Sequence, residues 1–213
     1  MYKKGLKRFI DVILALGGIV VFAVPMLIIA FVIRLDSPGP ALFRQKRIGI
    51  GKSHFNILKF RSMRTNTPGD TPTHQLQEAT CYITKVGAFL RKTSLDELPQ
   101  LFNILKGEMS VIGPRPALWN QYDLIAERDR YGANDVRPGL TGWAQVNGRD
   151  ELEIPVKAAF DGEYAGNLGP VMDLRCFLLT IRLVLKRDGV VEGGTGQLQI
   201  QTGSKAEIVE VCE

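Results

Sequence analysis

The sequence predicts an α+β protein that is mostly helical. We expect an N-terminal re-entrant membrane helix, then a compact cytosolic domain with a small β-hairpin and amphipathic interfacial helices. An uncharged run of about 22 residues, from 12 to 33, is long enough to cross a bilayer. Two strand-like runs follow it, and helical spacing dominates after residue 98. The expected divisions are an anchor at 1–34, a compact domain at 35–190 and a flexible tail at 191–213.

Basic residues stand on both sides of the apolar run. A spanning helix normally keeps its Lys and Arg excess on the cytoplasmic side. Pro25 removes a backbone hydrogen bond near the middle of the run and bends the helix. A bent helix that enters and leaves through one face suits both flanks, and an ordinary kinked spanning helix is the alternative. The flanking residues are Lys3, Lys4, Lys7 and Arg8 before the run and Arg34, Arg44, Lys46, Arg47 and Lys52 after it.

The elements after the anchor follow from turn residues and apolar spacing. Asp36 to Pro40 is dense in turn formers and ends the membrane segment. Residues 41–48 and 54–63, joined by a glycine-containing tetrapeptide, predict a hairpin. Helices are expected at 98–106 before Gly107, at 117–131 before Gly132, from near Pro155, and from Asp173 onward.

An apolar stripe runs along the last of these helices. Leu174, Phe177, Leu178, Ile181 and Leu185 recur on one helical face. Such a stripe is most often packed into a core. In a chain with an anchor, a cationic amphipathic helix lying in the membrane interface is an equal alternative.

Composition narrows the possible functions. The net charge of +5 and the pI of about 9.2 indicate an anionic partner: nucleic acid, anionic lipid or a phosphorylated substrate. The apolar anchor, and basic stretches without interleaved aromatic residues, argue against nucleic acid. The 3 cysteines share no paired spacing and only 2 histidines are present. We therefore expect reduced thiols, with neither a zinc site nor a disulfide framework.

Asp96 and Glu97 form a carboxylate pair within a basic stretch. Adjacent carboxylates suit phosphoryl chemistry, in which one attacks phosphorus and its neighbour holds a magnesium ion. Arg91, and Arg115 in a Gly-Pro-Arg-Pro turn, would offset phosphate charge in the transition state. The structural alternative for Glu97 is a capping box with Ser94 at the start of the following helix.

A third polar cluster runs from Arg137 to Arg149 and is rich in glycine. Its glycines permit close approach of the backbone to a ligand, and its two terminal arginines could contact phosphate. The alternative is a solvated glycine-rich loop.

Several long strings, in a fixed order, carry a family resemblance. In these sequence motifs the chain resembles the monotopic phosphoglycosyl transferases, also called bacterial sugar transferases, in their small catalytic-domain-only form. The family's bent helix often breaks at a Ser-Pro pair, where this chain has Val24-Pro25. The strings are Lys7-Arg-x-x-Asp11, Leu58-Lys-Phe-Arg-Ser-Met63, Ser94-Leu-Asp-Glu-Leu-Pro-Gln-Leu-Phe-Asn103, Leu105-Lys-Gly-Glu-Met-Ser110, Ile112-Gly-Pro-Arg-Pro116 and Arg137-Pro-Gly-Leu-Thr-Gly-Trp-Ala-Gln-Val-Asn-Gly-Arg149.

The resemblance implies a ping-pong reaction in which Asp96 attacks the β-phosphate of a UDP-sugar and UMP leaves. Undecaprenyl phosphate then collects the sugar-1-phosphate. Glu97, with Asp96, would hold Mg²⁺. The enzyme would be monotopic in the bacterial inner membrane, facing the cytoplasm among membrane lipids, and a homodimer is one assembly that the resemblance allows. The predicted phosphate-binding residues are Arg115, Arg91, Lys59, Arg137 and Arg149.

Two alternatives stay open at this point. A membrane-anchored adaptor that binds anionic lipids explains the anchor and the charge, but gives no reason for the carboxylate pair among arginines. A hydrolase would form the same intermediate and pass it to water. Release of UMP from a UDP-sugar without an acceptor would separate the adaptor from the enzymes.

Overall fold

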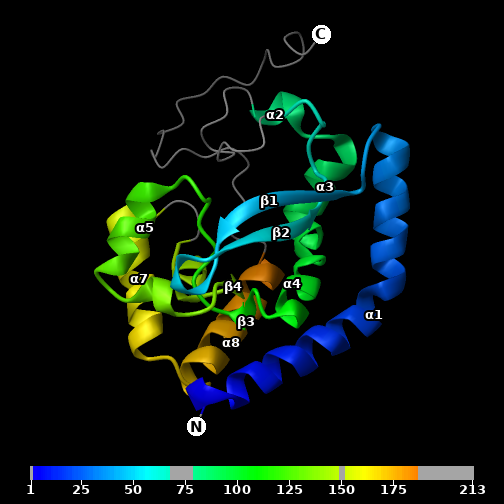
Figure 1. Ribbon diagram of the computed structural model, residues 1–213. Coiled ribbons are helices and arrows are strands. Elements are labelled where there is room, and N and C mark those ends of the chain that lie inside the picture. Colours follow the sequence, from blue (N-terminus) through cyan, green and yellow to red (C-terminus); the bar gives the residue numbers. More distant parts are fainter. Residues whose placement is uncertain (1, 68–78, 149–151, 187–213) are drawn as a thin grey trace.

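A computed structural model describes residues 2–67, 79–148 and 152–186, and it confirms a mostly helical chain with little strand (Figure 1). Arg149 and the predicted tail at 191–213 lie outside these residues. The long helix α1 (Leu6–Asp36) borders a domain made by the rest of the described chain. Its elements are η1 (Tyr2–Lys4), β1 (Leu42–Ile48), η2 (Ile50–Lys52), β2 (His54–Phe60), α2 (Ala79–Tyr82), α3 (Lys85–Thr93), η4 (Leu95–Glu97), α4 (Gln100–Lys106), β3 (Ser110–Ile112), α5 (Tyr122–Asp129), η5 (Ala133–Asp135), β4 (Gly139–Thr141), α6 (Trp143–Val146), α7 (Ile154–Gly166) and α8 (Pro170–Lys186).

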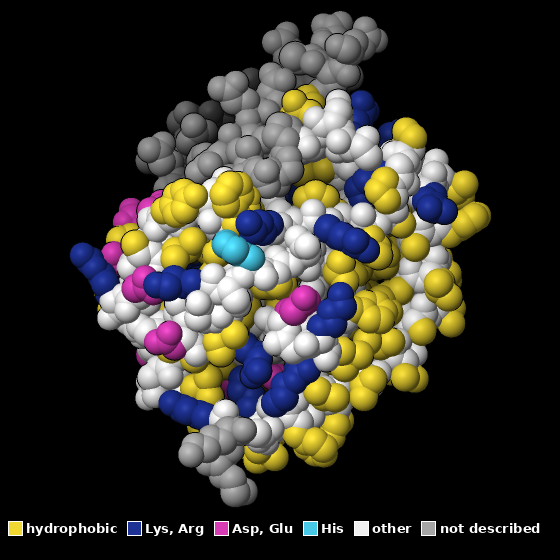
Figure 2. All heavy atoms as spheres, in the orientation of Figure 1, with side chains coloured by type: hydrophobic (Ala, Val, Ile, Leu, Met, Phe, Trp, Pro, Cys, Tyr) yellow, Lys and Arg dark blue, Asp and Glu magenta, His cyan; other side chains and the backbone are white. Residues whose placement is uncertain are grey.

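Helix α1 has the length and composition to anchor the chain in a membrane. Its most apolar window has a mean hydropathy of 2.9, and only 11% of that window is buried. Apolar side chains cover the edge of the molecule where α1 runs, whereas Lys and Arg gather over the middle of the face shown in Figure 2. The most exposed apolar residues of α1 are Phe9, Val20, Val21, Val24, Leu27, Phe31 and Leu35.

The first half of α1 is tied to the domain by two charged residues. Arg8 donates to the carbonyl oxygens of Ile104 and Leu105 at the end of α4 (2.5 and 2.9 Å). The buried carboxylate of Asp11 accepts from the Ser110 hydroxyl (2.8 Å) and the Val111 amide (3.0 Å) at β3. These bonds place a polar side chain of the helix against protein instead of lipid.

The far end of α1 is tied to the same domain. Helix α1 bends sharply along its course, and Pro25 lies inside it (Figure 1). Beyond the bend, the guanidinium of Arg61, after β2, donates to the carbonyls of Ser37 (2.6 Å) and Pro38 (2.7 Å) just past the helix end. The helix stops at Asp36, within the turn-rich segment that predicted its end.

The predicted hairpin is confirmed. Strands β1 and β2 pair antiparallel, with Leu42 opposite Phe60 and Ile48 opposite His54. The buried Asn103 of α4 fixes this hairpin to the helix. Its side-chain oxygen accepts from the Leu58 amide (2.9 Å), and its amide nitrogen donates to the Asn56 carbonyl (2.8 Å).

Of the four predicted helices, two are confirmed and two need correction. The helix expected from near Pro155 is α7, which begins at Ile154. Helix α4 ends at Gly107, whose φ of 89° is the left-handed value that glycine tolerates best. The helix predicted over 117–131 begins only at Tyr122. The preceding stretch continues the edge of the hairpin instead, because the Ala117 carbonyl accepts from the Ile48 amide (3.0 Å). Helix α8 begins at Pro170, three residues before the predicted start.

The apolar stripe of α8 lies on the molecular surface. Leu174 and Leu178 are 58% and 57% exposed, and Phe177 and Ile181 are exposed as well. Core packing is therefore the wrong interpretation of these four residues. The opposite side of α8 supplies the buried Cys176, which packs with Tyr164 of α7.

The expectation of reduced thiols holds for Cys176, which is free and buried.

Candidate active site

The two carboxylates lie on a one-turn 3-10 helix between α3 and α4. Ser94 takes a left-handed conformation (φ 56°) at the end of α3 and makes no side-chain hydrogen bond to the following turn. The capping box proposed as a structural role for Glu97 is therefore absent from this site. The Glu97 carboxylate instead forms ion pairs with two cationic side chains.

Lys59 and Arg115 reach this turn from two different elements. Phe55, Ile57 and Lys59 share the inward face of β2, so burial of the two apolar residues points the lysine toward η4. Lys59 Nζ lies 2.7 Å from Glu97 Oε1, and Arg115 Nη2 lies 3.1 Å from the same oxygen. The lysine is also 3.9 Å from Asp96 Oδ2, so one cation bridges both carboxylates.

The pKa values of the two neighbouring carboxyl groups are displaced in opposite directions. Burial raises the pKa of Asp96 above its ordinary value, although Lys59 and the nearby Arg91 oppose this shift. Burial would also raise the pKa of Glu97, but the charges of Lys59 and Arg115 outweigh it and hold that pKa well below its usual range. Opposite displacements in a pair of acids are typical of groups with different chemical roles.

The other predicted phosphate contacts are not all gathered here. Arg91, in the last turn of α3, is close enough to lower the pKa of Asp96 by its charge. Arg137 donates to the Gly107 carbonyl (3.1 Å), at the opposite end of α4 from the carboxylates. The structure thus groups Lys59, Arg91 and Arg115 with the pair and places Arg137 apart from it.

The segment that carries Asp96 packs against the apolar helix. Its residues Leu95 and Leu98 pack into a cluster with Met26 and Ile33 from the second half of α1. Asp96 itself is buried, with a side chain only 11% exposed. The segment that carries the carboxylate therefore lies where the domain meets the apolar helix.

The glycines of the third cluster approach the protein's own backbone, not a ligand surface. A Cβ added to Gly139 or Gly142 would lie 2.1 or 2.0 Å from backbone atoms of Gly113. Strands β3 and β4 pair in parallel at this point. These contacts fasten the turn that carries Arg115, and the prediction of ligand approach is not supported at these two positions.

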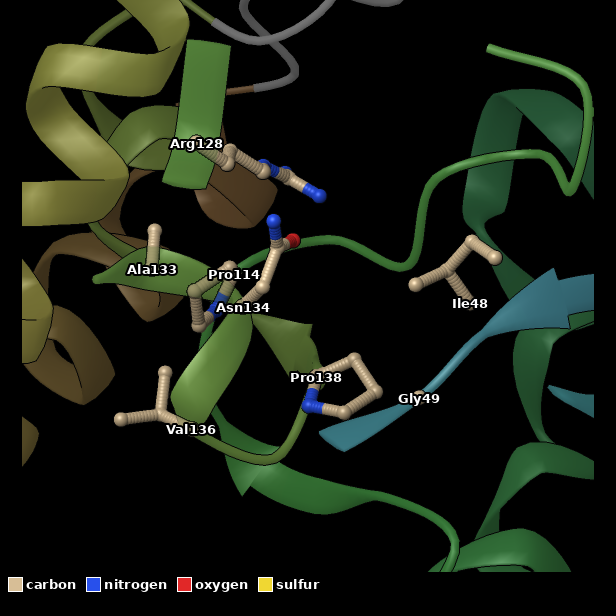
Figure 3. A pocket seen from close by; sticks show the side chains of 8 residues that line it. All are labelled: Ile48, Gly49, Pro114, Arg128, Ala133, Asn134, Val136 and Pro138. Atoms are coloured by element: carbon tan, nitrogen blue, oxygen red, sulfur yellow. The ribbon is translucent and has the colours of Figure 1, made fainter. Parts of the chain in front are cut away.

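A small hollow lies behind the turn, where Pro114 and Arg128 line its wall (Figure 3). Its volume of about 10 Å³ has room for one water molecule. It is too small for a nucleotide sugar, and neither Asp96 nor Glu97 lines it.

Asp96 and Glu97 are the oxygen donors available to a metal at this site. Within the described part of the chain, no three His, Cys, Asp or Glu side chains come together in a metal-binding group. Magnesium does not require one, because it commonly uses one or two carboxylates and fills its remaining positions with water and substrate phosphate. The two carboxylates of Asp96 and Glu97 fit this mode of magnesium coordination.

An apolar anchor helix joined to a carboxylate pair among cations defines a class: membrane-associated enzymes that act on phosphate groups. The chain belongs to the bacterial sugar transferase family, whose sequence profile matches residues 2–187.

Its relatives include proteins named for sugar-phosphate transfer. It is 40% identical to a UDP-glucose:undecaprenyl-phosphate glucose-1-phosphate transferase of Xanthomonas campestris, over 84% of this chain and 38% of that protein. It is 39% identical to a UDP-N-acetylgalactosamine-undecaprenyl-phosphate N-acetylgalactosaminephosphotransferase of Aeromonas hydrophila, over 84% and 44%. An exopolysaccharide production protein of Rhizobium leguminosarum is 40% identical, over 85% and 96%. The chain thus spans less than half of some relatives and nearly all of others.

Proposed function

We propose that the protein transfers a sugar-1-phosphate from a UDP-sugar to undecaprenyl phosphate and releases UMP. The observation that carries this proposal is the Asp96–Glu97 pair, which meets Lys59, Arg91 and Arg115 beside an apolar helix. Water-soluble donor and lipid acceptor can both reach such a boundary. The names of two relatives describe this transfer with different sugars.

In the first half-reaction, a carboxylate oxygen of Asp96 attacks the β-phosphorus of the donor. The bond from that phosphorus to the oxygen bridging the two phosphates breaks, and the oxygen leaves with UMP. An acyl phosphate then joins Asp96 to the sugar. Lys59 and Arg115, which contact the carboxylate pair, would offset the charge that builds on phosphate oxygens.

In the second half-reaction, a phosphate oxygen of the lipid attacks the same phosphorus. The acyl phosphate bond breaks, the sugar-linked diphosphate departs on the lipid, and the carboxylate of Asp96 is restored. Because donor and acceptor use the site in turn, one buried carboxylate can serve both reactions.

Magnesium would be held by Glu97 with help from Asp96. When bound, it would neutralise part of the charge on the substrate's phosphate groups. Glu97 suits this position because its low pKa keeps it ionised.

The apolar helix would be re-entrant, with the domain on the cytoplasmic side of the bacterial inner membrane. A straight helix of 31 residues is about 46 Å long, which would set its ends on opposite sides of a bilayer. Here Arg8 and Asp11 bond one end to the domain, and Arg61 bonds the other. The exposed apolar stripe of α8 would lie in the membrane interface.

Cysteine accessibility tests this topology. In a chain whose native cysteines are replaced, Lys3→Cys and Ile50→Cys report the two flanks of α1, and both positions are exposed. We expect both to react with a membrane-impermeant maleimide in inside-out vesicles and neither in right-side-out vesicles. Val20→Cys, on the lipid-facing surface, should react in neither. Labelling of the two flanks from opposite sides would establish a spanning helix.

Release of UMP tests the activity itself. Purified protein in nanodiscs should release UMP from at least one UDP-sugar and, with undecaprenyl phosphate present, turn over repeatedly. Without the lipid we expect one equivalent of UMP per active site, because the aspartyl adduct then has no acceptor. An adaptor would release none, and a hydrolase would continue to release UMP without lipid.

A further inference from the structure

The turn that presents Arg115 is held by its carbonyl groups. It contains Pro114 and Pro116, which have no backbone N–H and cannot donate to a neighbouring segment. Three consecutive carbonyls accept instead. The Pro114 oxygen accepts from the Gly139 amide at 2.8 Å, and the next two oxygens accept from arginine side chains.

The first of these arginines comes from α5. Arg128 Nη2 donates to the carbonyl of Arg115 at 2.9 Å. The Arg128 guanidinium is buried and also donates through Nε to Asp161 of α7 at 2.9 Å. It lines the small hollow behind the turn with Pro114 (Figure 3). The buried ion pair therefore reaches the backbone of the turn from behind.

The second arginine comes from β1. Arg47 Nη1 donates to the carbonyl of Pro116 at 3.0 Å, while its Nε and Nη2 atoms donate to Gln45 two residues earlier on the same strand (3.1 and 2.5 Å). Gln45 thereby orients the guanidinium toward the turn. The same hairpin carries Lys59. The turn and one of the site's cations are therefore both held in place by this hairpin.

We infer that Arg47 and Arg128 are positioning residues for the reaction, which hold the backbone of the turn so that the Arg115 side chain meets Glu97 and the donor's phosphate. Neither contacts the carboxylates, and each acts through Arg115. The inference rests on the proposed function, since it concerns the cation that offsets phosphate charge. Small displacements of such a group are costly, because a misplacement of about 1 Å can slow a reaction about 100-fold.

A double-mutant cycle on the full-length protein tests this inference. The variants are Arg47→Met, Arg115→Met and the double variant, and the readout is the rate of UMP release at saturating UDP-sugar. We expect Arg47→Met alone to slow release by about 10- to 100-fold. In the Arg115→Met background the same change should cost less than about 2-fold, because the group that it positions is already gone.

Arg44→Met is the matched control. Arg44 lies on the same strand, three residues away and on its other face, and its side chain is exposed. It should leave the rate within about 2-fold of the unmodified protein and show no coupling to Arg115. If Arg47→Met lowers the melting temperature strongly, Gln45→Leu removes the group that orients Arg47 and should slow release less, with the same coupling.

The outcomes separate the two claims. Equal losses from Arg47→Met in both backgrounds, or no loss from it alone, would overturn the positioning role while leaving the proposed function intact. An unchanged rate in Arg115→Met would instead remove Arg115 from the proposed mechanism.

Discussion

Asp96→Asn should eliminate both half-reactions. An amide cannot form the acyl phosphate that the mechanism requires. The rate of UMP release should therefore fall by at least about 10³-fold, as it does when other enzymes lose a covalent nucleophile. Intact-protein mass spectrometry after mixing with donor alone should show the added sugar-phosphate on the unmodified chain and none on the variant. The adduct should be removed by hydroxylamine, which cleaves acyl phosphates.

Asparagine has almost the same shape as aspartate, so the fold should survive this change. Asp135→Asn, an exposed position in η5, is the matched control and should keep full activity and the adduct. Near-normal turnover in Asp96→Asn, or a label that maps to another residue, would exclude Asp96 as the nucleophile.

Glu97→Gln should weaken the response to magnesium. The substitution removes a charge that the low pKa of Glu97 keeps in place across the neutral range. EDTA should stop UMP release by the unmodified chain, and added Mg²⁺ should restore it. In the variant, the Mg²⁺ concentration for half-maximal rate should rise by about 100-fold or more, since even outer-sphere partners of a metal are worth about 10–100-fold in affinity.

Glu127→Gln serves as the control for this experiment. Glu127 of α5 pairs with Arg130 just past the end of that helix, away from the carboxylate pair in sequence and in its ion-pair partner. It should leave the magnesium dependence unchanged. Full activity of the unmodified chain in chelator would remove the metal from the mechanism. A normal magnesium response in Glu97→Gln would mean that Glu97 only balances the charges of Lys59 and Arg115 and does not hold the metal.

Strong local patterns made much of the fold predictable. The apolar run from 12 to 33, the hairpin and the stop of α4 at Gly107 each depend on residues close together in sequence. The parallel pairing of β3 with β4 was not predicted, because strands of three residues are too short to show a period. The late start of α5 was missed for a related reason, since Ala117 pairs with Ile48 far away in the chain.

The site was predictable to the extent that its chemistry appears in short motifs. Asp96 and Glu97 are adjacent, and the two prolines around Arg115 draw attention to it. Arg47 and Arg128 were not identified as site residues, because a guanidinium that holds a distant carbonyl leaves no spacing signal. The serine-to-glutamate spacing was misleading: Ser94 matches the capping-box pattern at Glu97, yet its left-handed backbone ends one helix without capping the next.

The packing of Leu95 and Leu98 against α1 has a consequence for how the enzyme meets its acceptor. If α1 lies in the bilayer as proposed, the height of Asp96 above the hydrocarbon is set by the anchor itself and not by a linker. A polyprenol that diffuses laterally would then bring its headgroup to the reacting carboxylate without leaving the leaflet. The lipid would then reach the site by lateral diffusion within the membrane, whereas the nucleotide sugar would reach it by diffusion through the solution.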